Sequence, residues 1–244
     1  MVTARAEEIA SNLGTIRRRL DQAASDAGRD PADVRLIVVT KTIPLAAIRD
    51  AIAAGAHDLG ENYVAELREK RSALADPTVR WHYIGALQSG TANHVADLAD
   101  VVHTVAGEHA ARRLAGRSTR NGRTLDAFLE VDFTGGRAGV APVDAAAAAD
   151  LVASLEGLRL RGVMTIAPQT PDAEGARPWF RRLRELRDTL RERHPDVLEL
   201  SMGMSLDYQV AVQEGATMVR IGTAVFGARM PRPGGERPGP DPGS

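Results

Sequence analysis

Cysteine is absent from the 244 residues of this sequence. Its absence excludes disulfide bonds, thiol nucleophiles, iron–sulfur clusters and cysteine-ligated zinc. Neither sign of charge is in excess, because 31 basic residues stand against 32 acidic ones and the formal net charge is -1. The chain therefore lacks the basic excess that is typical of proteins that bind nucleic acids or anionic membranes. We expect neither partner.

Long hydrophobic runs and a signal peptide are missing as well. No apolar run approaches the roughly 18 residues of a membrane-spanning helix. Residues 1–8 already carry charges, which is not typical of a secretory signal. Hydrophobic residues make up 43% of the chain and charged residues 26%, which is the usual globular mixture. These features predict a soluble, cytoplasmic protein.

Several common catalytic motifs are also lacking. The sequence has no G-x-S-x-G, no Walker loop and no G-x-G-x-x-G behind a strand, which argues against a serine hydrolase or a common nucleotide-binding fold. The six histidines show no i, i+4 pairing and no nearby acidic pair at ligand spacing. We therefore expect no metal site.

The sequence opens with the pattern of an amphipathic helix. Ile9, Leu13, Ile16 and Leu20 recur at helical spacing on one face, and Gly28 marks the expected end.

Short apolar runs then alternate with stretches of helical spacing. The predicted strands are residues 35–40, 57–60, 80–85, 101–104, 127–132, 159–166, 198–201 and 217–221. The predicted helices are residues 44–54, 63–74, 91–98, 108–117, 142–155, 175–193 and 206–214. Gly55, Gly157 and Gly215 lie where three of these helices should end, the usual place for a left-handed cap.

Eight strand–helix units in one chain of this length predict a single α/β domain, a (β/α)8 TIM barrel over residues 1–230 with an extra N-terminal helix. A closed barrel leaves no sheet edge exposed; an open doubly wound sheet is the alternative. Residues 231–244 contain five prolines and four glycines. This composition cannot bury a core, so we expect a disordered tail.

Lys41 follows an apolar run that is typical of a buried central strand. In a barrel the active site lies at the carboxyl ends of the strands. A lysine there projects into the mouth of the barrel, where burial favours the neutral amine. A neutral amine attacks a carbonyl to form a Schiff base. The alternative is an ordinary rim lysine whose ammonium stays in water.

Two segments near the end of the ordered chain suggest a phosphate site. In residues 201–207, Ser205 lies where the N-cap of a helix belongs, with Asp207 in its first turn. In residues 219–227, Gly222 allows a close approach of the backbone and Thr223 adds a hydroxyl. Barrels often bind phosphate in the loops after strands seven and eight, which these segments form. A well-capped helix without a ligand is the alternative.

Three further polar residues have both a functional and a structural interpretation. Arg220 lies in an apolar run and needs a partner, which is either a ligand or a salt bridge across the barrel interior. His82 is more often a hydrogen-bonded core histidine than a catalyst. Asn62 and Tyr63 are also consistent with a simple helix start.

Five ordered motifs give the sequence a specific resemblance. They are VTKT (39–42), GENYV (60–64), WHYIGALQ (81–88), SMGMS (201–205) and VRIGT (219–223). Across residues 34–229 the chain resembles the pyridoxal-phosphate homeostasis proteins of the YggS/PROSC type. The resemblance implies a single barrel like the N-terminal half of the fold-type III enzymes, such as alanine racemase.

The resemblance also assigns roles toward pyridoxal 5'-phosphate (PLP). It implies that Lys41 forms the internal aldimine, that Ser205, the backbone of Gly222 and Thr223, and the Thr223 hydroxyl hold the phosphate, and that Arg220 faces the pyridine nitrogen. Asn62, His82 and Met204 are expected around the cofactor.

These roles predict a carrier rather than an enzyme. An arginine opposite the ring nitrogen disfavours its protonation and weakens PLP as an electron sink. A racemase also needs a second acid/base; Tyr208 is the one residue to consider. We therefore expect storage, buffering or delivery of PLP without amino-acid turnover. The alternatives are a racemase, decarboxylase or lyase that uses PLP, and a barrel without PLP whose Lys41 attacks a phosphorylated sugar, as in class I aldolases.

Two departures from the family pattern fall on the predicted rim. The chain has Gly90 and Thr91 where an Asn-Lys pair is usual, and Ala106 and Gly107 near the usual place of an acidic residue. They affect contacts at the rim and leave Lys41 unchanged. The resemblance further suggests a monomer that can meet PLP-dependent apo-enzymes as recipients.

Overall fold

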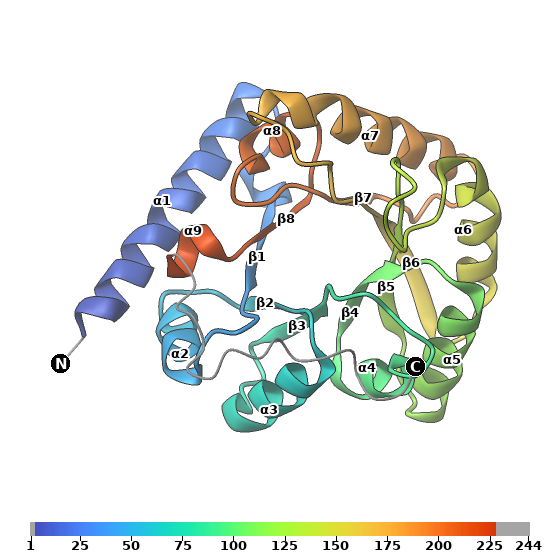
Figure 1. Cartoon of the computed structure of the whole chain (residues 1–244), viewed down its shortest axis with the longest axis horizontal. Coiled ribbons are helices and arrows are strands. Elements are labelled where there is room, and N and C mark those ends of the chain that lie inside the picture. Colours follow the sequence, from blue (N-terminus) through green and yellow to red (C-terminus); the bar gives the residue numbers. More distant parts are fainter. Residues whose placement is uncertain (1–2, 228–244) are drawn as a thin grey trace.

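The computed structural model describes residues 3–227 and has eight parallel strands that close into a barrel in chain order (Figure 1). The strands are β1 (Arg35–Val39), β2 (Asp58–Glu61), β3 (Arg80–Tyr83), β4 (Val101–Val105), β5 (Leu125–Glu130), β6 (Leu158–Met164), β7 (Glu199–Ser201) and β8 (Met218–Ile221). All eight predicted strands are present within two residues of their expected ends. The predicted closed barrel is confirmed and the open sheet is wrong. The predicted tail, residues 231–244, lies outside the described residues.

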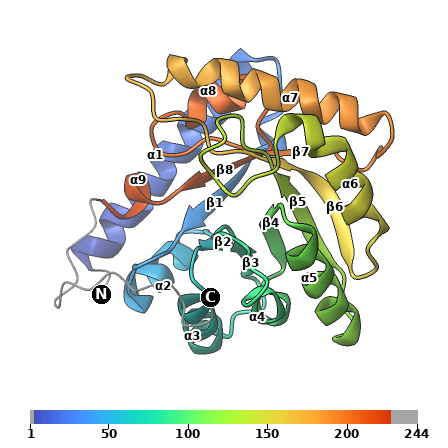
Figure 2. The same ribbon diagram turned by 45° about the vertical axis from the view of Figure 1, so that its right-hand side comes forward.

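Helices surround the strands as an outer ring (Figure 1 and Figure 2). They are α1 (Ala4–Asp26), α2 (Leu45–Ala53), α3 (Val64–Leu74), α4 (Ala92–Leu98), α5 (Glu108–Arg120), α6 (Ala145–Ser154), α7 (Arg177–Arg191), α8 (Tyr208–Gln213) and α9 (Thr223–Phe226). The seven predicted crossover helices are confirmed. Two of them are preceded by 3-10 turns, η2 (Pro142–Asp144) and η3 (Glu174–Ala176), where the predictions began an α-helix; a further turn, η1 (Pro31–Asp33), precedes β1. The three predicted glycine caps have φ values of +89°, +87° and +102°.

The extra N-terminal helix packs on the barrel beside α2, α8 and α9. Its predicted apolar face is buried, and Thr3 caps its first turn by accepting a hydrogen bond from the backbone N–H of Ala6. Asn12 donates to the carbonyl of Val225 over 3.0 Å. The helix therefore supports the segment that follows β8. Between residues 3 and 227, no helix combines the length and apolar character that a membrane crossing requires.

Each strand is covered by helices on its outer side and faces other strands on its inner side, so most strand residues are buried. A small apolar cluster fills part of the barrel interior: Ile37, Val101, Phe128, Met164 and Met218. The interior also holds polar side chains, among them His82, His103 and Ser201, which are fully buried. The carboxyl ends of the strands stay free of this packing and carry the site.

Strands β6 and β7 approach so closely at Gly162 that no side chain fits. An ideal Cβ on Gly162 would lie 2.0 Å from the carbonyl oxygen of Glu199, its partner across the strands. Gly116, in α5, has open space instead, with only the tip of Arg120 within 3.9 Å of such a Cβ.

We therefore predict opposite effects of two glycine-to-alanine changes on the free energy of unfolding. Gly162→Ala should destabilise the protein by about 1–3 kcal/mol because the strands must separate. Gly116→Ala should stabilise it by roughly 0.5–1 kcal/mol because alanine loses less backbone entropy in a helix. Urea unfolding of both variants measures this. Equal midpoints for the two variants would contradict the close approach.

Candidate functional site

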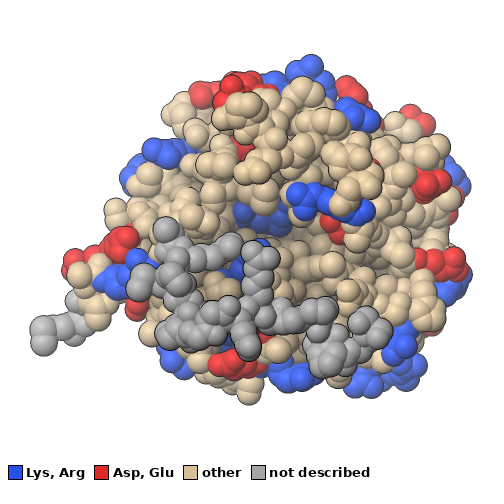
Figure 3. Space-filling view, viewed as in Figure 1, with Lys and Arg blue, Asp and Glu red and all other residues tan. Residues whose placement is uncertain are grey.

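A cavity of about 540 Å³ opens at the carboxyl ends of the strands. In the view of Figure 3, the centre of the molecule is hollowed, and lysine or arginine atoms lie inside the hollow. Seven of the eight sequence-predicted site residues line the cavity: Lys41, Asn62, Met204, Ser205, Arg220, Gly222 and Thr223. They come from the ends of β1, β2, β7 and β8, so the barrel brings together residues that are far apart in the sequence.

Lys41 follows directly on β1, on a short turn with an unusual backbone. Its neighbour Thr42 has φ +64°, a left-handed conformation that residues other than glycine rarely adopt. The N–H of Thr42 donates to Glu66 Oε2 over 2.7 Å. Such strain persists only where the surroundings impose it, and it is concentrated at functional sites. The turn that carries Lys41 is therefore held in place by α3.

The buried ammonium of Lys70, on α3, is the centre of that support. It donates to the carbonyl of Thr40 and to Glu61 Oε1, each over 2.6 Å, and to Glu66 Oε2 over 2.7 Å. Burial raises the pKa of Glu61, and the charge of Lys70 opposes this rise. The residues on both sides of Lys41 are thus tied to one buried ion cluster.

Sequence reasoning missed this cluster, which we call the α3 clamp (Glu61, Glu66 and Lys70). The i, i+4 spacing of Glu66 and Lys70 was a signal for an ion pair, but it is common on exposed helix surfaces. Only the fold reveals that Lys70 is 6% exposed and lies beside a strand end.

The loop after β7 differs from its prediction. Ser205 is not the N-cap of a helix, because α8 begins at Tyr208 and Asp207 occupies the cap position. Asp207 Oδ1 accepts the N–H of Met204 over 2.6 Å and closes the turn that contains Ser205. Ser205 instead lies on this turn at the edge of the cavity, where its hydroxyl lines the wall.

The loops after β7 and β8 are joined to each other and to β1. The N–H of Arg220 donates to the carbonyl of Gly203 over 3.0 Å. A Cβ on Gly222 would lie 3.0 Å from the carbonyl oxygen of Val39, so glycine permits the close approach of this loop to the strand before Lys41. The α9 helix starts at Thr223, and the first N–H groups of a helix have no partner within it. The loop after β8 therefore lies against the end of β1, just before Lys41.

Arg220 lies in the floor of the cavity and is 5% exposed. Its guanidinium donates to Ser201 Oγ over 2.7 Å and to the carbonyl of Thr165 over 2.9 Å. Burial lowers its pKa to about 10, while the charges of Glu130 and Asp207 oppose the decrease. Within residues 3–227, neutral oxygens thus take the place of the salt bridge that was one of the two predicted alternatives.

His82 is the one predicted site residue that does not line the cavity. It is fully buried in the barrel interior and contacts His103 and Asp58, each over 2.8 Å. This matches the interpretation as a hydrogen-bonded core histidine. Asn62 does line the cavity, and its Oδ1 is a buried oxygen without a hydrogen-bond partner among the described residues. Such an oxygen is suited to a donor on a ligand.

Residues that sequence reasoning did not select complete the cavity. The loop after β6 contributes the largest group: Ile166, Ala167, Pro168, Gln169, Thr170, Pro171, Asp172 and Ala173. Arg137, from the loop after β5, and Leu206 also line it. The position of these loops at strand ends was a usable signal, but they carry no recognisable motif.

Gly90 and Thr91 fall in the turn before α4, and Ala106 and Gly107 in the turn before α5. Neither pair is among the residues that line the cavity. The departures from the family pattern therefore leave the cavity wall unchanged. Across residues 3–227, no group of three or more histidine, aspartate or glutamate side chains could hold a metal ion.

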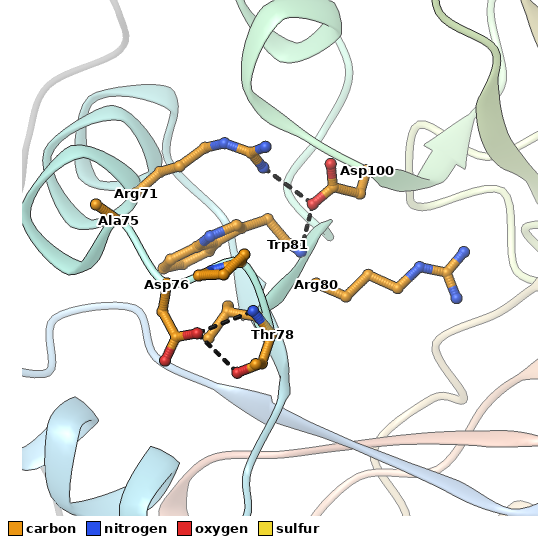
Figure 4. Close-up of a pocket in the computed structure, with 9 residues that line it drawn as sticks. Arg71, Ala75, Asp76, Thr78, Arg80, Trp81 and Asp100 are labelled. Atoms are coloured by element: carbon orange, nitrogen blue, oxygen red, sulfur yellow. Dashed lines mark hydrogen bonds and ion pairs between the residues drawn. The ribbon is translucent and has the colours of Figure 1, made fainter.

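A second hollow, of about 450 Å³, lies at the start of β3 (Figure 4). Its polar side chains are engaged with each other. Asp76 accepts hydrogen bonds from the N–H and hydroxyl of Thr78, and Asp100 accepts them from Arg71 and the N–H of Trp81. It contains none of the predicted site residues and opens at the amino ends of the strands. The chemistry of the barrel therefore belongs to the first cavity.

Comparisons with known proteins find relatives along nearly the whole chain. The sequence model of the alanine racemase N-terminal domain family matches residues 11–230. The chain is 44% identical to a pyridoxal phosphate homeostasis protein of Pseudomonas aeruginosa, over 91% of this chain and 96% of that one. It is 38% identical to one of Escherichia coli, over 91% and 97%.

Solved structures show the same barrel. PipY of Synechococcus elongatus with PLP bound is 36% identical and has a TM-score of 0.80, covering 90% of this chain and 100% of that one. An alanine racemase of Clostridium difficile, at 14% identity and a TM-score of 0.72, covers 93% of this chain and 58% of the racemase. The racemase likeness concerns the fold alone.

The α3 clamp yields a stability prediction. Lys70→Met leaves Glu61, which is fully buried, without its cation, and breaking a buried pair in this way costs about 3–5 kcal/mol. Urea unfolding should show the loss. Adding Glu61→Gln to Lys70→Met should restore part of it, since the fully buried carboxylate is then neutral and only Glu66, 13% exposed, keeps its charge.

The matched control is Arg112→Met, which removes an exposed i, i+4 ion pair with Glu108. Surface pairs contribute little, so its unfolding midpoint should stay at that of the wild type. If Lys70→Met behaved like this control, the clamp would have no structural importance.

Proposed function

The chain belongs to the family of the pyridoxal phosphate homeostasis proteins, and we propose that it binds PLP in the cavity at the carboxyl ends of the strands and serves the homeostasis of this cofactor. The proposal rests on the convergence of Lys41 with Ser205, Arg220, Gly222 and Thr223 around one opening. Amine, cation, hydroxyls and backbone N–H groups are the complement that an aldehyde with a phosphate ester requires.

The cavity fits such a ligand in size and chemistry. Its volume of about 540 Å³ lies in the range typical of small-molecule sites. The amine of Lys41 would hold the aldehyde carbon. Ser205, Thr223 and the first N–H groups of α9 would hold the phosphate, because helix starts attract anions. Arg220 would donate to the ring nitrogen, and Asn62 offers an unpaired buried oxygen.

When bound, PLP supplies an electron sink that is strongest with a protonated ring nitrogen. Arg220 opposes that protonation, since a guanidinium with a pKa of about 10 stays charged at neutral pH and donates rather than accepts. The chain therefore presents PLP in a state of low reactivity. This supports a carrier.

The acid/base groups at the cavity support the same conclusion. Of the carboxylates that line it, Asp207 accepts the N–H of Met204 and Asp172 accepts the N–H of Gly175. Both are engaged in holding their loops. Tyr208 is buried and does not line the cavity. We infer that the protein does not turn over amino acids.

The rim of the cavity is suited to transfer of the cofactor. Leu206 is 83% exposed and Met204 is 38% exposed, so apolar side chains stand open at the mouth. We infer that the protein acts in the cytoplasm as a monomer and passes PLP to PLP-dependent apo-enzymes, whose surfaces meet this rim during transfer.

The attachment of PLP to Lys41 is the first point to test. After incubation with PLP and borohydride reduction, intact-mass measurement should show one added pyridoxyl phosphate, located on Lys41 by peptide mapping. Lys41→Ala should lose the adduct because, of the residues that line the cavity, Lys41 alone carries an amine. Lys70→Arg, which keeps a cation in the α3 clamp, is the control and should retain it.

An adduct of equal yield in Lys41→Ala would refute the assignment. The loaded protein should also leave the α-hydrogen of the common amino acids unexchanged in deuterium oxide. Exchange at enzymatic rates would instead favour a racemase, decarboxylase or lyase, and Asp207→Asn would then identify the base.

The phosphate assignment predicts a loss of retention. Ser205→Ala combined with Thr223→Val removes two hydroxyl donors, each worth roughly 1.5–3 kcal/mol toward a charged ligand. Both proteins are loaded with PLP, without borohydride reduction, and dialysed. The double variant should lose PLP faster than the wild type. Thr170→Val, on the loop after β6 in the same cavity, is the matched control and should keep wild-type retention. Equal retention in the double variant would place the phosphate elsewhere.

A further inference from the structure

A continuous row of hydrogen bonds crosses the barrel interior beneath the cavity. Asp58 Oδ1 lies 2.8 Å from His82 Nε2, and His82 Nδ1 lies 2.8 Å from His103 Nε2. His103 Nδ1 lies 2.8 Å from Ser201 Oγ, which accepts from Arg220 over 2.7 Å. We call Asp58, His82, His103 and Ser201 the interior relay. It connects the start of β2 with the guanidinium in the cavity floor.

The two ends of the row set the direction of every hydrogen bond. A guanidinium only donates, so Ser201 Oγ accepts from Arg220, and its own hydrogen remains for the unprotonated Nδ1 of a neutral His103. A carboxylate only accepts, so His82 Nε2 must carry the hydrogen that Asp58 receives. In the bond between the two rings, His103 Nε2 then donates its hydrogen to His82 Nδ1. Both histidines are neutral, with the hydrogen on Nε2.

The surroundings agree with neutral rings. Burial lowers the pKa of His82 and lowers that of His103 well below its usual value. Burial raises the pKa of Asp58, but the hydrogen bond with His82 and the positive charges of Arg35 and Arg80 oppose this rise, so the net direction is downward and the carboxylate stays ionised. The His103 ring is stacked on Phe128 with 4.7 Å between centroids, which holds its plane.

The common direction of these hydrogen bonds does more than give each buried polar atom a partner. Hydrogen bonds in series strengthen one another in a low dielectric. The anion at Asp58 makes each ring a better acceptor, and Ser201 consequently becomes a better acceptor for Arg220. A buried arginine that lacks an ion pair within residues 3–227 thus gains a distant negative charge through four hydrogen bonds and three neutral side chains.

We propose that the interior relay positions the guanidinium of Arg220 for the ligand and transmits to it the charge at the opposite end of the barrel. The relay makes the hold on the ligand in the cavity depend on a carboxylate that the ligand never touches. The ligand part of this inference rests on the proposed binding of PLP, whereas the relay itself does not.

The first experiment uses the full chain without PLP. Nitrogen NMR of the imidazole rings reports which ring nitrogen carries the hydrogen. In the wild type, His82 and His103 should both be protonated on Nε2 alone. A hydrogen on Nδ1 of either ring, or a doubly protonated ring at neutral pH, would overturn the relay whatever the protein binds.

The second experiment changes the distant end. Asp58→Asn keeps the size and the acceptor oxygen but removes the charge. It should shift the nitrogen signals of both histidines and of the Arg220 side chain. Asp126→Asn is the matched control, because Asp126 is also a carboxylate at the amino ends of the strands but pairs with Arg80 and Arg159 instead of the relay. Shifts confined to His82 would overturn transmission to Arg220.

The third experiment measures the effect on the cofactor. The rate of PLP release into an excess of a trapping apo-enzyme should rise by about two- to fivefold in Asp58→Asn, as expected for cooperative bonds weakened by some tens of per cent. It should rise about tenfold in Ser201→Ala, which removes one charge-assisted bond of Arg220. Asp126→Asn should release PLP as the wild type does.

The outcomes separate the two proposals. If the wild type retains no PLP, the proposed function fails while the ring tautomers still decide the relay. If PLP is retained but Asp58→Asn releases it at the rate of Asp126→Asn, the relay does not reach the ligand and the inference is wrong.

Discussion

Closure of the barrel between β1 and β8 is the constraint on which the site depends. Ile37 pairs with Arg220 and Val38 with Ile221, so the first and last strands lie side by side with their carboxyl ends together. This register brings Gly222 against Val39, two residues before Lys41, although the two segments come from opposite ends of the chain. Helix α1 reinforces the contact by binding the carbonyl of Val225. An open sheet of the same strands would leave the amine of Lys41 and the loop after β8 on separate edges.

Two buried cations of the barrel are stabilised in different ways, Lys70 by carboxylates and Arg220 by neutral oxygens. Lys70 neutralises Glu61 beside β1, and the hydroxyl of Thr40 adds a hydrogen bond of 2.6 Å to the same carboxylate. Arg220 instead relies on neutral oxygens and a row of rings. The two arrangements differ in purpose: the first fixes a backbone turn, and the second orients a donor in the cavity floor.

The same arrangement underlies our proposal that this racemase-like barrel holds PLP without turning over amino acids. A fixed arginine against the ring side of the cavity weakens the electron sink, and the nearby carboxylates are engaged by loop N–H groups. Attachment and release need only the amine, the anion site and an open rim. Turnover of an amino acid would need an acid/base as well, and both carboxylates that line the described cavity are engaged in holding their loops.

The alternation of apolar runs and helical stretches was enough to predict the strands, the helices and the closed barrel, because these follow from local periodicity and chain length. The motifs also predicted seven residues of the cavity wall, since parallel strands place all their carboxyl ends on one face. Only the tertiary structure decided the role of Lys70 and the partners of Arg220, and it corrected the cap at Ser205. The reason is physical. An ion pair, a tautomer or a turn depends on which side chains contact each other across the barrel, and the spacing of strands along the sequence does not specify those contacts.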